Sequence, residues 1–515
     1  MSIKLFDTTL RDGTQREGVS LTSEDKLRIA RVLDSLGIHY IEAGFPASNP
    51  KDLELFENFD AAELENARLV AFTRTRRASS RAKDDPAVSL LPHLSAPAAC
   101  IVAKSWRLHV EKVLGITPEE NLEAIRDTVS YLVEAGKEVI FDAEHYFDGF
   151  RDDPEHALSV LRAAAEAGAS SLVLCDTNGG TLPTELKAIV SRTVKEFSDV
   201  EIGIHTHNDA GCGVANALLA VEAGATQVQG TINGVGERCG NCDLITTIAD
   251  LQLKMGLGVL PPENLSRLTE VSNFVSEVMN LTPDAHRPYV GHSAFAHKGG
   301  LHVDGVSRDP STYEHVPPEA VGNRRRTPVG ELAGKNSLRA KAKELGLEVG
   351  DVSAVLAEIK RREHAGYHYE AADASLALLI ERASGKHEPL FELESFRIIS
   401  ERRADGETTV EATIKLRVGG ERVISTAEGN GPVNALDRAL RQAIEPHYPQ
   451  LSGIHLSNYK VRILDEHRAT AATTRVLIDS TDGKRVWGAV GVGENIIEAS
   501  WQALVDGLEY GVGHS

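Results

Sequence analysis

Short apolar runs alternate with amphipathic helical patterns through the first half of the chain. Glu24–Gly37 illustrates the helical pattern, because Ile29, Val32, Leu33 and Leu36 fall on one face of a helix. The apolar runs predict buried parallel strands, since each is short and is followed by a helix-length segment. Eight such runs are present, at Lys4–Leu10, Tyr40–Phe45, Ala67–Phe72, Ala98–Lys104, Glu138–His145, Ser171–Thr177, Glu201–His207 and Thr226–Gly234.

Eight strand–helix units in about 250 residues are typical of a (β/α)8 TIM barrel. The alternative is a doubly wound open sheet, but that fold places a Gly-rich nucleotide-binding turn after its first strand, and none follows here. We therefore predict an α/β fold in which residues 1–260 form a TIM-barrel catalytic domain.

The pattern changes near Leu260. Helical segments continue to residue 385, and a stretch rich in His, Gly and Pro interrupts them at Gly291–Asn323. A long stretch of this composition is typical of a functional loop. Residues 261–385 are therefore predicted to form a helical linker region that contributes to the active site.

Alternating strands follow from residue 386, and their pattern repeats weakly. Each copy indicates a strand-strand-helix unit, with the turns Gly429-Asn430-Gly431 and Gly491-Val492-Gly493 opening the two helices. The two copies predict a C-terminal α+β domain, residues 386–515, with an internal pseudo-twofold.

The two Gly-x-Gly turns have two interpretations. The glycines could simply make tight turns. Free N–H groups at a helix N-terminus also favour a carboxylate, so these turns are candidates for an amino-acid-binding allosteric site. The candidate residues are Gly429, Gly431, Gly491 and Gly493, with Val433, Ala435, Leu436, Ile496 and Ile497 as the apolar lining.

Composition and charge disfavour several classes of protein. No stretch approaches the roughly 18 apolar residues of a membrane span, and the first residues lack an apolar signal segment. Five irregularly spaced cysteines are typical of a reduced cytosolic protein, so a cytoplasmic location is predicted. Lys and Arg number 55 against 75 Asp and Glu, and the net charge of -20 disfavours nucleic-acid or anionic membrane partners. An anionic substrate would need a local cationic cluster or a metal ion.

Polar residues gather where the predicted strands end. In a TIM barrel the chemistry takes place at the C-terminal ends of the strands, and burying so many charges without a function would be costly. Solvated loop residues are the alternative, which suits Asp209 and His145 better than the whole set. The set comprises Asp7, Arg11, Asp12, Glu42, Arg74, Lys104, Asp142, Glu144, His145, Asp176, Thr177, His205, His207, Asp209, Asn233, Glu237, Arg238 and Asn241.

His205 and His207 lie two positions apart at the end of the seventh strand. Alternation along a strand places them on the same face, about 6.6 Å apart. Two neutral imidazoles and a carboxylate form a divalent-metal shell with open positions for a substrate, suited to zinc, manganese, cobalt or magnesium. Asp12 is the natural carboxylate, because the first strand neighbours the seventh and eighth in a closed barrel. Asn241 offers a neutral oxygen beside them.

Other motifs give weaker signals. Cys239–Cys242 forms a lone C-x-x-C, which lacks the second pair that a structural zinc site needs. The Gly-x-Gly turns lack the sequence context of dinucleotide binding. No Gly-x-Ser-x-Gly, P-loop or kinase signature is present.

Several long motifs resemble one family of enzymes. Asp7–Gly18, His205–Asp209 and Asn233–Leu244 are similar to the signatures of the 2-isopropylmalate synthase, homocitrate synthase and citramalate synthase superfamily. The resemblance covers essentially the full length, including Gly299–Gly305 and Tyr313–Asn323. Within this superfamily, the segments FDAEHYFDGF, CDTNGG and ENIIEASWQAL resemble the (R)-citramalate synthase family more than the isopropylmalate synthases.

The resemblance implies an acyltransferase that condenses acetyl-CoA with pyruvate and water to give (R)-citramalate and CoA. This reaction opens a threonine-independent route to isoleucine, and the resemblance implies feedback inhibition by isoleucine and a homodimer. A 2-isopropylmalate synthase, which uses 2-oxoisovalerate, is the alternative. A metal-dependent aldol-type lyase on the same barrel is a more distant one. Asn178-Gly179-Gly180 replaces a bulkier turn of isopropylmalate synthases, which favours the smaller substrate.

The resemblance also implies roles for individual residues. Asp12, His205, His207 and Asn241 would be the metal ligands. Arg11, Asp12, Arg74 and Thr177 would bind the substrate, with Arg11 polarising its keto oxygen. Arg11, Glu144, His302 and Tyr313 would be catalytic, with Glu144 beside the metal and His302 as the base on the acetyl-CoA side.

Overall fold

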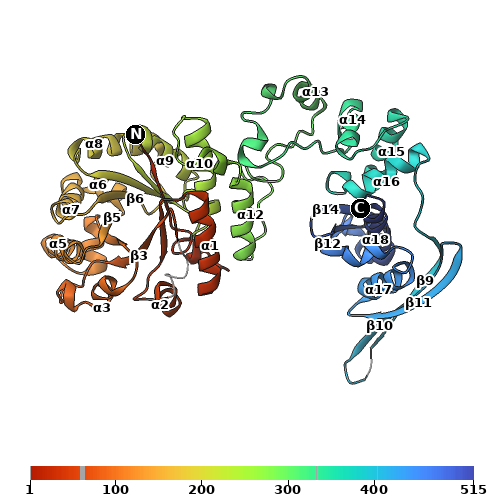
Figure 1. The fold of residues 1–515 in the computed structure, drawn as a ribbon, viewed down its shortest axis with the longest axis horizontal. Coiled ribbons are helices and arrows are strands. Elements are labelled where there is room, and N and C mark those ends of the chain that lie inside the picture. The colour runs from red at the N-terminus through yellow and green to blue at the C-terminus, as the bar shows by residue number, and fades with distance from the viewer. Residues whose placement is uncertain (1, 58–63, 332, 403, 515) are drawn as a thin grey trace. The chain divides into compact units, whose positions relative to one another are not determined.

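The computed structural model describes residues 2–57, 64–331, 333–402 and 404–514 (Figure 1). The chain divides into two compact units. The first consists of Met1–Phe295 and Val316–Arg324, and the second of Ala296–His315 and Arg325–Ser515. Each unit has its own hydrophobic core.

Eight parallel strands form a closed barrel in the first unit, in the order β1 to β8. The barrel closes because β1 pairs with both β2 and β8. Each strand overlaps one of the apolar runs, so the TIM-barrel prediction is confirmed. The strands are β1 (Lys4–Asp7), β2 (Tyr40–Gly44), β3 (Arg68–Arg74), β4 (Ala98–Lys104), β5 (Glu138–Glu144), β6 (Ser171–Asp176), β7 (Glu201–Thr206) and β8 (Gln227–Gly230).

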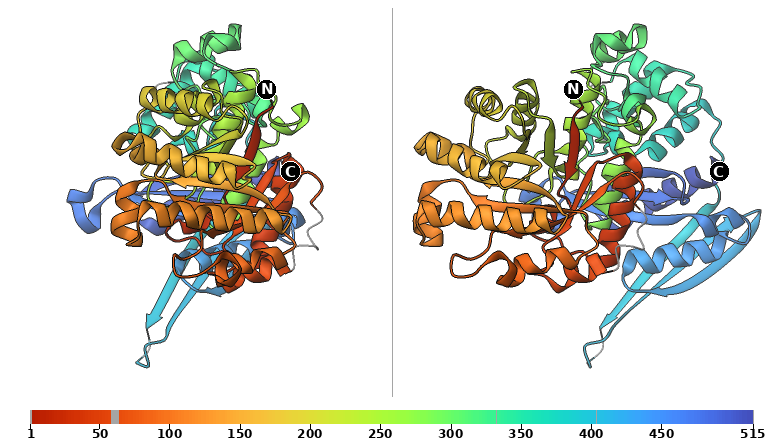
Figure 2. Two further views of the ribbon diagram at one scale, coloured as in Figure 1. Left: turned by 90° about the vertical axis from the view of Figure 1, so that its left-hand side faces the viewer. Right: turned by 60° about the vertical axis from the view of Figure 1, so that its left-hand side comes forward.

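Helices cover the outside of the barrel (Figure 2). Their ends follow local sequence signals: at the N-terminus of α1 (Ser23–Leu36), Thr22 and Asp25 form a reciprocal capping box, and Gly37 ends the helix in the left-handed conformation. The other helices of this unit are α2 (Pro50–Glu57), α3 (Pro86–Ser89), α4 (Arg107–His109), α5 (Pro118–Glu134), α6 (Tyr146–Asp152), α7 (Pro154–Glu166), α8 (Pro183–Glu196), α9 (Gly213–Glu222), α10 (Leu244–Leu253), α11 (Pro262–Leu265) and α12 (Leu268–Val278).

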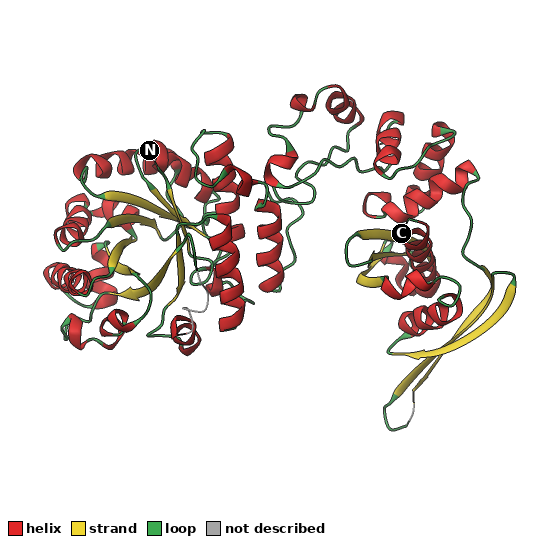
Figure 3. Ribbon diagram, viewed as in Figure 1, coloured by secondary structure: helices red, strands yellow, loops and turns green. Residues whose placement is uncertain are grey.

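The second unit begins with helices and continues with two open sheets (Figure 3). The helices are α13 (Gly300–Arg308), α14 (Lys335–Glu344), α15 (Val352–His364) and α16 (Asp373–Ser384). The sheets have the orders β11-β10-β9 and β12-β13-β14, and a helix follows each in the chain. Their elements are β9 (Glu392–Arg402), β10 (Thr408–Val418), β11 (Glu421–Gly429), α17 (Pro432–Ile444), β12 (His455–Ile463), β13 (Thr474–Thr481), β14 (Val486–Gly493) and α18 (Ile496–Gly513).

The C-terminal α+β domain and its repeat are confirmed, but each copy contains three strands instead of the expected two. The first strand of each copy, β9 or β12, lies at a sheet edge and is largely exposed. The apolar residues of these edge strands are largely exposed and mark no buried face, which explains why the sequence understates the strand count. No described helix combines the length and the apolar character that a bilayer span requires.

Candidate active site

Three buried side chains meet at the C-terminal ends of β1 and β7. Asp12 lies in the segment after β1 and directly precedes the short 3-10 helix Gly13–Gln15, His205 lies in β7, and His207 follows β7. The Nε2 atom of His205 lies 3.3 Å from Nε2 of His207 and 3.3 Å from Oδ2 of Asp12. One ligating atom from each residue falls within 4.8 Å of the others, as in a metal shell.

These spacings fit a divalent ion. Neighbouring ligands about 2.1 Å from a six-coordinate ion lie about 3 Å apart, close to the 3.3 Å separations of the two imidazoles and the carboxylate. The ordinary alternative, a hydrogen-bonded histidine pair, would not explain why a fourth polar group converges on the same point.

The fourth group is Asn241, which a backbone bridge to His207 brings to the site. Its side-chain nitrogen lies 3.2 Å from Oδ2 of Asp12 and 3.3 Å from Nε2 of His205. Among the described residues its Oδ1 atom is buried without a hydrogen-bond partner. Rotating the amide by 180° would bring this oxygen to the site, where it would be a suitable metal ligand.

The surroundings give these groups the protonation states that a metal requires. Burial raises the pKa of Asp12, but Arg11 and the two histidines outweigh it and hold that pKa below its ordinary value. Burial, reinforced by His205, lowers the pKa of His207 to about 3. At neutral pH the carboxylate is therefore ionised and His207 is neutral, as metal ligands must be.

Arg11 lies among acidic and aromatic side chains beside this group. Its guanidinium stands 4.0 Å from the ring centre of Phe72, donates from Nε to Glu42 at 2.5 Å and pairs through Nη1 with Asp12. Burial lowers the pKa of Arg11, but the two carboxylates raise it above its ordinary value. Within the described residues Nη2 has no hydrogen-bond partner, so Arg11 keeps a charged donor for a ligand.

Glu144 and Thr177 lie at the ends of the neighbouring strands. Glu144 forms an ion pair of 2.5 Å with Lys104, across β4 and β5. The hydroxyl oxygen of Thr177 accepts the backbone N–H of His145 at 2.8 Å. The hydroxyl hydrogen of Thr177 is thereby left to donate to another acceptor.

Arg74, unlike Arg11, is bound to residues outside the Asp12 group. Its guanidinium lies 3.2 and 3.4 Å from the buried carboxylate of Asp85 and 2.6 Å from the carbonyl oxygen of Thr75. The structure therefore ties Arg74 to the segment after β3, and none of its hydrogen bonds within the described residues reaches the Asp12 group.

Arg238 joins the ends of three strands. It donates to both carboxylate oxygens of Asp209, at 2.8 and 3.0 Å, and to the carbonyl oxygen of Thr177. Its Nη2 atom also lies 3.2 Å from Nδ1 of His207. Asp209 is therefore an ion-pair partner within the site rim, not merely a solvated loop residue.

Gln229 in β8 is a site residue that sequence reasoning missed. It is fully buried, and its Oε1 atom lies 2.8 Å from Nδ1 of His205. The signal was available, because Gln227 and Gln229 alternate in a strand that is otherwise apolar or small, which places both on one face. The C-x-x-C segment, by contrast, separates an exposed Cys239 from a buried Cys242.

His302 and Tyr313 belong to the second unit. Their rings stack with centroids 4.3 Å apart, and both residues are exposed. The pair therefore presents an imidazole and a phenol together at the surface of its own unit.

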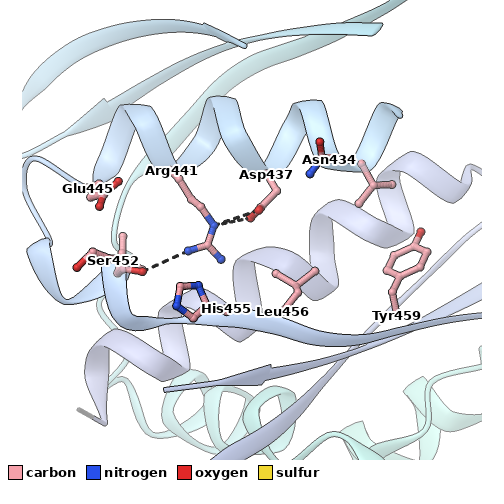
Figure 4. Close-up of a pocket in the computed structure, with 10 residues that line it drawn as sticks. Asn434, Asp437, Arg441, Glu445, Ser452, His455, Leu456 and Tyr459 are labelled. Carbon is pink, nitrogen blue, oxygen red and sulfur yellow. Dashed lines mark hydrogen bonds and ion pairs between the residues drawn. The ribbon is translucent and has the colours of Figure 1, made fainter. Parts of the chain in front are cut away.

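The second unit also contains a pocket of about 510 Å³ between α17, β12 and the turn that joins them (Figure 4). Asp437 and Arg441, one turn apart on α17, pair at 2.9 Å along one wall of the pocket, and Arg441 also donates to the carbonyl oxygens of Leu451 and Ile454. Ionic groups thus lie beside apolar walls. The lining residues are Val433, Asn434, Asp437, Arg441, Glu445, Leu451, Ser452, His455, Leu456 and Tyr459.

The two Gly-x-Gly turns occupy different positions. Gly431 caps α17, next to Val433 and Asn434, which line one end of the pocket. The second turn, by contrast, does not cap its helix, because the N-cap of α18 is Asn495. A side chain at Gly429 or Gly491 would collide with the backbone of the following helix. These two glycines therefore have a packing role, because they allow each helix to approach its strand closely.

Comparison with known families divides the chain into three parts. Residues 2–275 match the family described as HMGL-like. Residues 289–366 match the homocitrate synthase post-HMGL domain-like family. Residues 370–512 match the LeuA allosteric (dimerisation) domain.

Individual relatives match over the whole chain. The (R)-citramalate synthase of Aquifex aeolicus is 51% identical over 513 residues, which are 99% of this chain and 97% of that protein. The (R)-citramalate synthase of Streptomyces coelicolor is 52% identical over 518 residues, with the same coverage of 99% and 97%. A probable 2-isopropylmalate synthase of Methanopyrus kandleri is 34% identical over 512 residues, covering 98% of this chain and 97% of that protein.

Proposed function

The chain belongs to the HMGL-like family and, within it, to the (R)-citramalate synthases, and we propose that it condenses acetyl-CoA with pyruvate and water to give (R)-citramalate and CoA. The observation that carries this proposal is the full-length identity of about one half to citramalate synthases, against about one third to a probable 2-isopropylmalate synthase. The family resemblance drawn from the sequence is confirmed.

Four residues are proposed to hold the metal ion: Asp12, His205, His207 and Asn241. A bound divalent ion would supply Lewis-acid activation of the 2-oxo acid. The buried, neutral His207 and the ionised Asp12 support this role, as does the buried oxygen of Asn241. The identity of the metal is left to measurement, because zinc, manganese, cobalt and magnesium all suit such ligands.

Arg11 is proposed to donate to the keto oxygen of pyruvate. Negative charge develops on this oxygen as the new carbon–carbon bond forms, so the interaction is stronger in the transition state than in the ground state. Glu42 and Phe72 already hold the guanidinium in place, and little reorganisation is needed during the reaction. Thr177, with its hydroxyl hydrogen available, is proposed to donate to the pyruvate carboxylate.

The remaining assigned residues are proposed to take part in the same reaction. His302, with Tyr313 stacked on it, is proposed to remove a proton from the acetyl methyl group through a hydroxyl or a water molecule. The resulting enolate carbon attacks the keto carbon, and water then hydrolyses the thioester and releases CoA. Glu144 is proposed to act beside the metal, and Arg74 to add positive charge for the anionic substrates.

One assay tests the reaction. The assay follows CoA release from acetyl-CoA. The kcat/KM for pyruvate should be at least about tenfold higher than that for 2-oxoisovalerate, a difference of about 1.4 kcal/mol in transition-state binding. Without an oxo acid, release should be negligible. Equal rates or a preference for 2-oxoisovalerate would instead identify a 2-isopropylmalate synthase, and cleavage of citramalate without net synthesis would identify a lyase.

Residues 386–515 are proposed to act as the regulatory domain, following the barrel (1–260) and the helical linker (261–385), with isoleucine as the effector. The match to the LeuA allosteric domain supports regulation by a small molecule. The pocket beside α17 offers what an amino acid needs: Asp437 and Glu445 for an ammonium, Arg441 for a carboxylate, and apolar walls. Gly429, Gly431, Gly491 and Gly493 shape the strand–helix turns of this domain.

Isoleucine titration tests the effector. Isoleucine should inhibit the full-length enzyme and raise its melting temperature, whereas removing the chain after about residue 390 should abolish inhibition. If isoleucine does neither to the full-length enzyme, the domain has another ligand. A homodimer is also proposed, because this region matches a dimerisation domain.

A further inference from the structure

A buried chain of hydrogen bonds runs across the barrel behind the metal group. Gln229 of β8 donates from Nε2 to Oδ1 of Asp142, in β5, at 3.1 Å, and faces Nδ1 of His205 with its Oε1 atom at 2.8 Å. Asp142, His205 and Gln229 are 3%, 5% and 0% exposed, so water does not compete for these bonds. The three residues come from β5, β7 and β8.

The orientation of the Gln229 amide follows from its neighbours. Oδ1 of Asp142 lies at hydrogen-bond distance from the amide nitrogen, and a carboxylate oxygen accepts, so the amide turns its NH2 group towards Asp142. Oε1 of Gln227, 3.5 Å from the same nitrogen, acts in the same direction. The amide oxygen of Gln229 is thereby left facing His205, where it can only accept.

We propose that Gln229, oriented by Asp142, is a positioning residue that holds His205 in the tautomer with hydrogen on Nδ1 and a lone pair on Nε2 directed at the metal. A ligating histidine commonly donates its other ring N–H to an acceptor in this way, which fixes the ring orientation and raises its basicity. This inference rests on the proposed metal-dependent function, and it assigns a role to two buried residues outside the proposed ligand set.

His207, the second histidine of the group, has the opposite hydrogen-bonding environment. Nδ1 of His207 faces the guanidinium of Arg238 at 3.2 Å, and a guanidinium has only donors. In this arrangement His207 carries its hydrogen on Nε2 and donates it to the lone pair of His205, 3.3 Å away. His205 is therefore the ligand prepared in advance, whereas His207 must move its proton to bind a metal through Nε2.

The experiment measures Mn²⁺ binding by calorimetry to chelator-treated, full-length protein. Gln229→Met keeps the side-chain length but removes the acceptor, and should weaken Mn²⁺ binding about 10- to 100-fold. The double variant Asp142→Asn with Gln229→Glu exchanges the amide and the acid without changing their shapes. The swap moves the donor to position 142 and keeps an acceptor for His205 at position 229, so binding should return to within a few-fold of the wild type.

A matched control removes an equally buried amide elsewhere in the barrel. Asn216 in α9 donates to the carbonyl oxygen of Thr181, and Asn216→Leu should leave Mn²⁺ affinity unchanged while lowering the melting temperature about as much as Gln229→Met. The ¹⁵N spectrum of the metal-free protein, with histidine labelled and His205→Gln used for assignment, should show the hydrogen of His205 on Nδ1. In Gln229→Met this preference should be lost.

Each result decides between possibilities. Wild-type affinity in Gln229→Met, or a hydrogen on Nε2 of His205 in the metal-free wild type, would overturn the inference. A swap variant as weak as Gln229→Met would also overturn it, because packing alone would then explain the loss. Failure of the wild type to bind any divalent ion would instead count against the proposed function.

Discussion

The sheet of the first unit closes on itself, whereas the two sheets of the second unit stay open. In the barrel, every strand from β1 to β8 has two neighbours. In the second unit, β9, β11, β12 and β14 are sheet edges, and these strands carry exposed apolar side chains. They include Leu393, Ile399, Ile424, Tyr459, Val461, Ile463 and Val486.

The closed sheet and the open sheets suit different functions. The closed barrel buries Asp12, His205 and His207 at its strand ends, and the pKa of His207 is shifted and the ring of His205 is held by a hydrogen bond. Open edges and exposed apolar residues suit association with another chain and binding of a ligand. The first arrangement favours chemistry in a preorganised centre, and the second favours regulation through binding.

The largest effect should come from the metal group of the barrel. His207→Ala is expected to lower kcat on the order of 10³-fold, since Lewis-acid activation contributes several kcal/mol, while unfolding stays cooperative. Chelation of the metal should abolish the activity of the wild type in the same assay. His93→Ala, which removes an exposed histidine of the same unit, should change kcat little. Full activity in extensively chelated protein would contradict the metal assignment.

A second test concerns the pKa values that closure produces. Burial raises the pKa of Asp7 from 3.8 to about 7. Between these values the folded protein holds a proton that the unfolded chain releases, so Asp7 makes stability fall as pH rises from about 4 to about 7. The slope is at most about 1.4 kcal/mol per pH unit for one group.

Asp7→Asn should flatten this part of the profile of unfolding free energy against pH. Asp25→Asn serves as the control, because hydrogen bonds to Thr22 lower the pKa of Asp25 and its contribution changes only below this pH range. An unchanged profile in Asp7→Asn would show that Asp7 is ionised in the folded protein throughout.

In the second unit, inhibition by isoleucine should depend on the apolar wall of the pocket beside α17. Leu456→Asn is expected to raise the isoleucine concentration for half-inhibition about tenfold, equivalent to about 1.4 kcal/mol, with kcat unchanged. Val486→Asn alters an exposed apolar residue outside the pocket lining and should not affect inhibition. Equal inhibition of the Leu456 variant and the wild type would place the effector elsewhere.

The smallest effect should come from a single residue of an open sheet. Ile399 in β9 is 50% exposed, and Ile399→Lys should weaken self-association about fivefold, or roughly 1 kcal/mol. Ile399→Val keeps the apolar character and should associate as the wild type does. Sedimentation equilibrium at several protein concentrations measures both. Unchanged association of the Lys variant would show that this face is solvated in the assembled protein.

Local patterns in the sequence determined much of the barrel. Each of its strands is buried on both sides, so each leaves a continuous apolar run that can be recognised without a partner. The spacing of His205 and His207 predicted a shared face because strand alternation is a local property. Asp12 was then assigned from the closure of the barrel alone.

Tertiary structure decided what depends on partners distant in sequence. Gln229 contacts residues 24 and 87 positions away. Its alternation with Gln227 predicts that both share a face, but it does not identify these partners. Likewise, Arg74 ends in a pair with Asp85, and the pocket of the second unit forms where α17 meets β12. The additional strand of each repeat, β9 or β12, escaped recognition because an exposed edge strand takes its stability from hydrogen bonds to its neighbour. The hydrophobic periodicity of a sequence indicates which residues are buried, but it does not indicate which polar atoms the fold brings together.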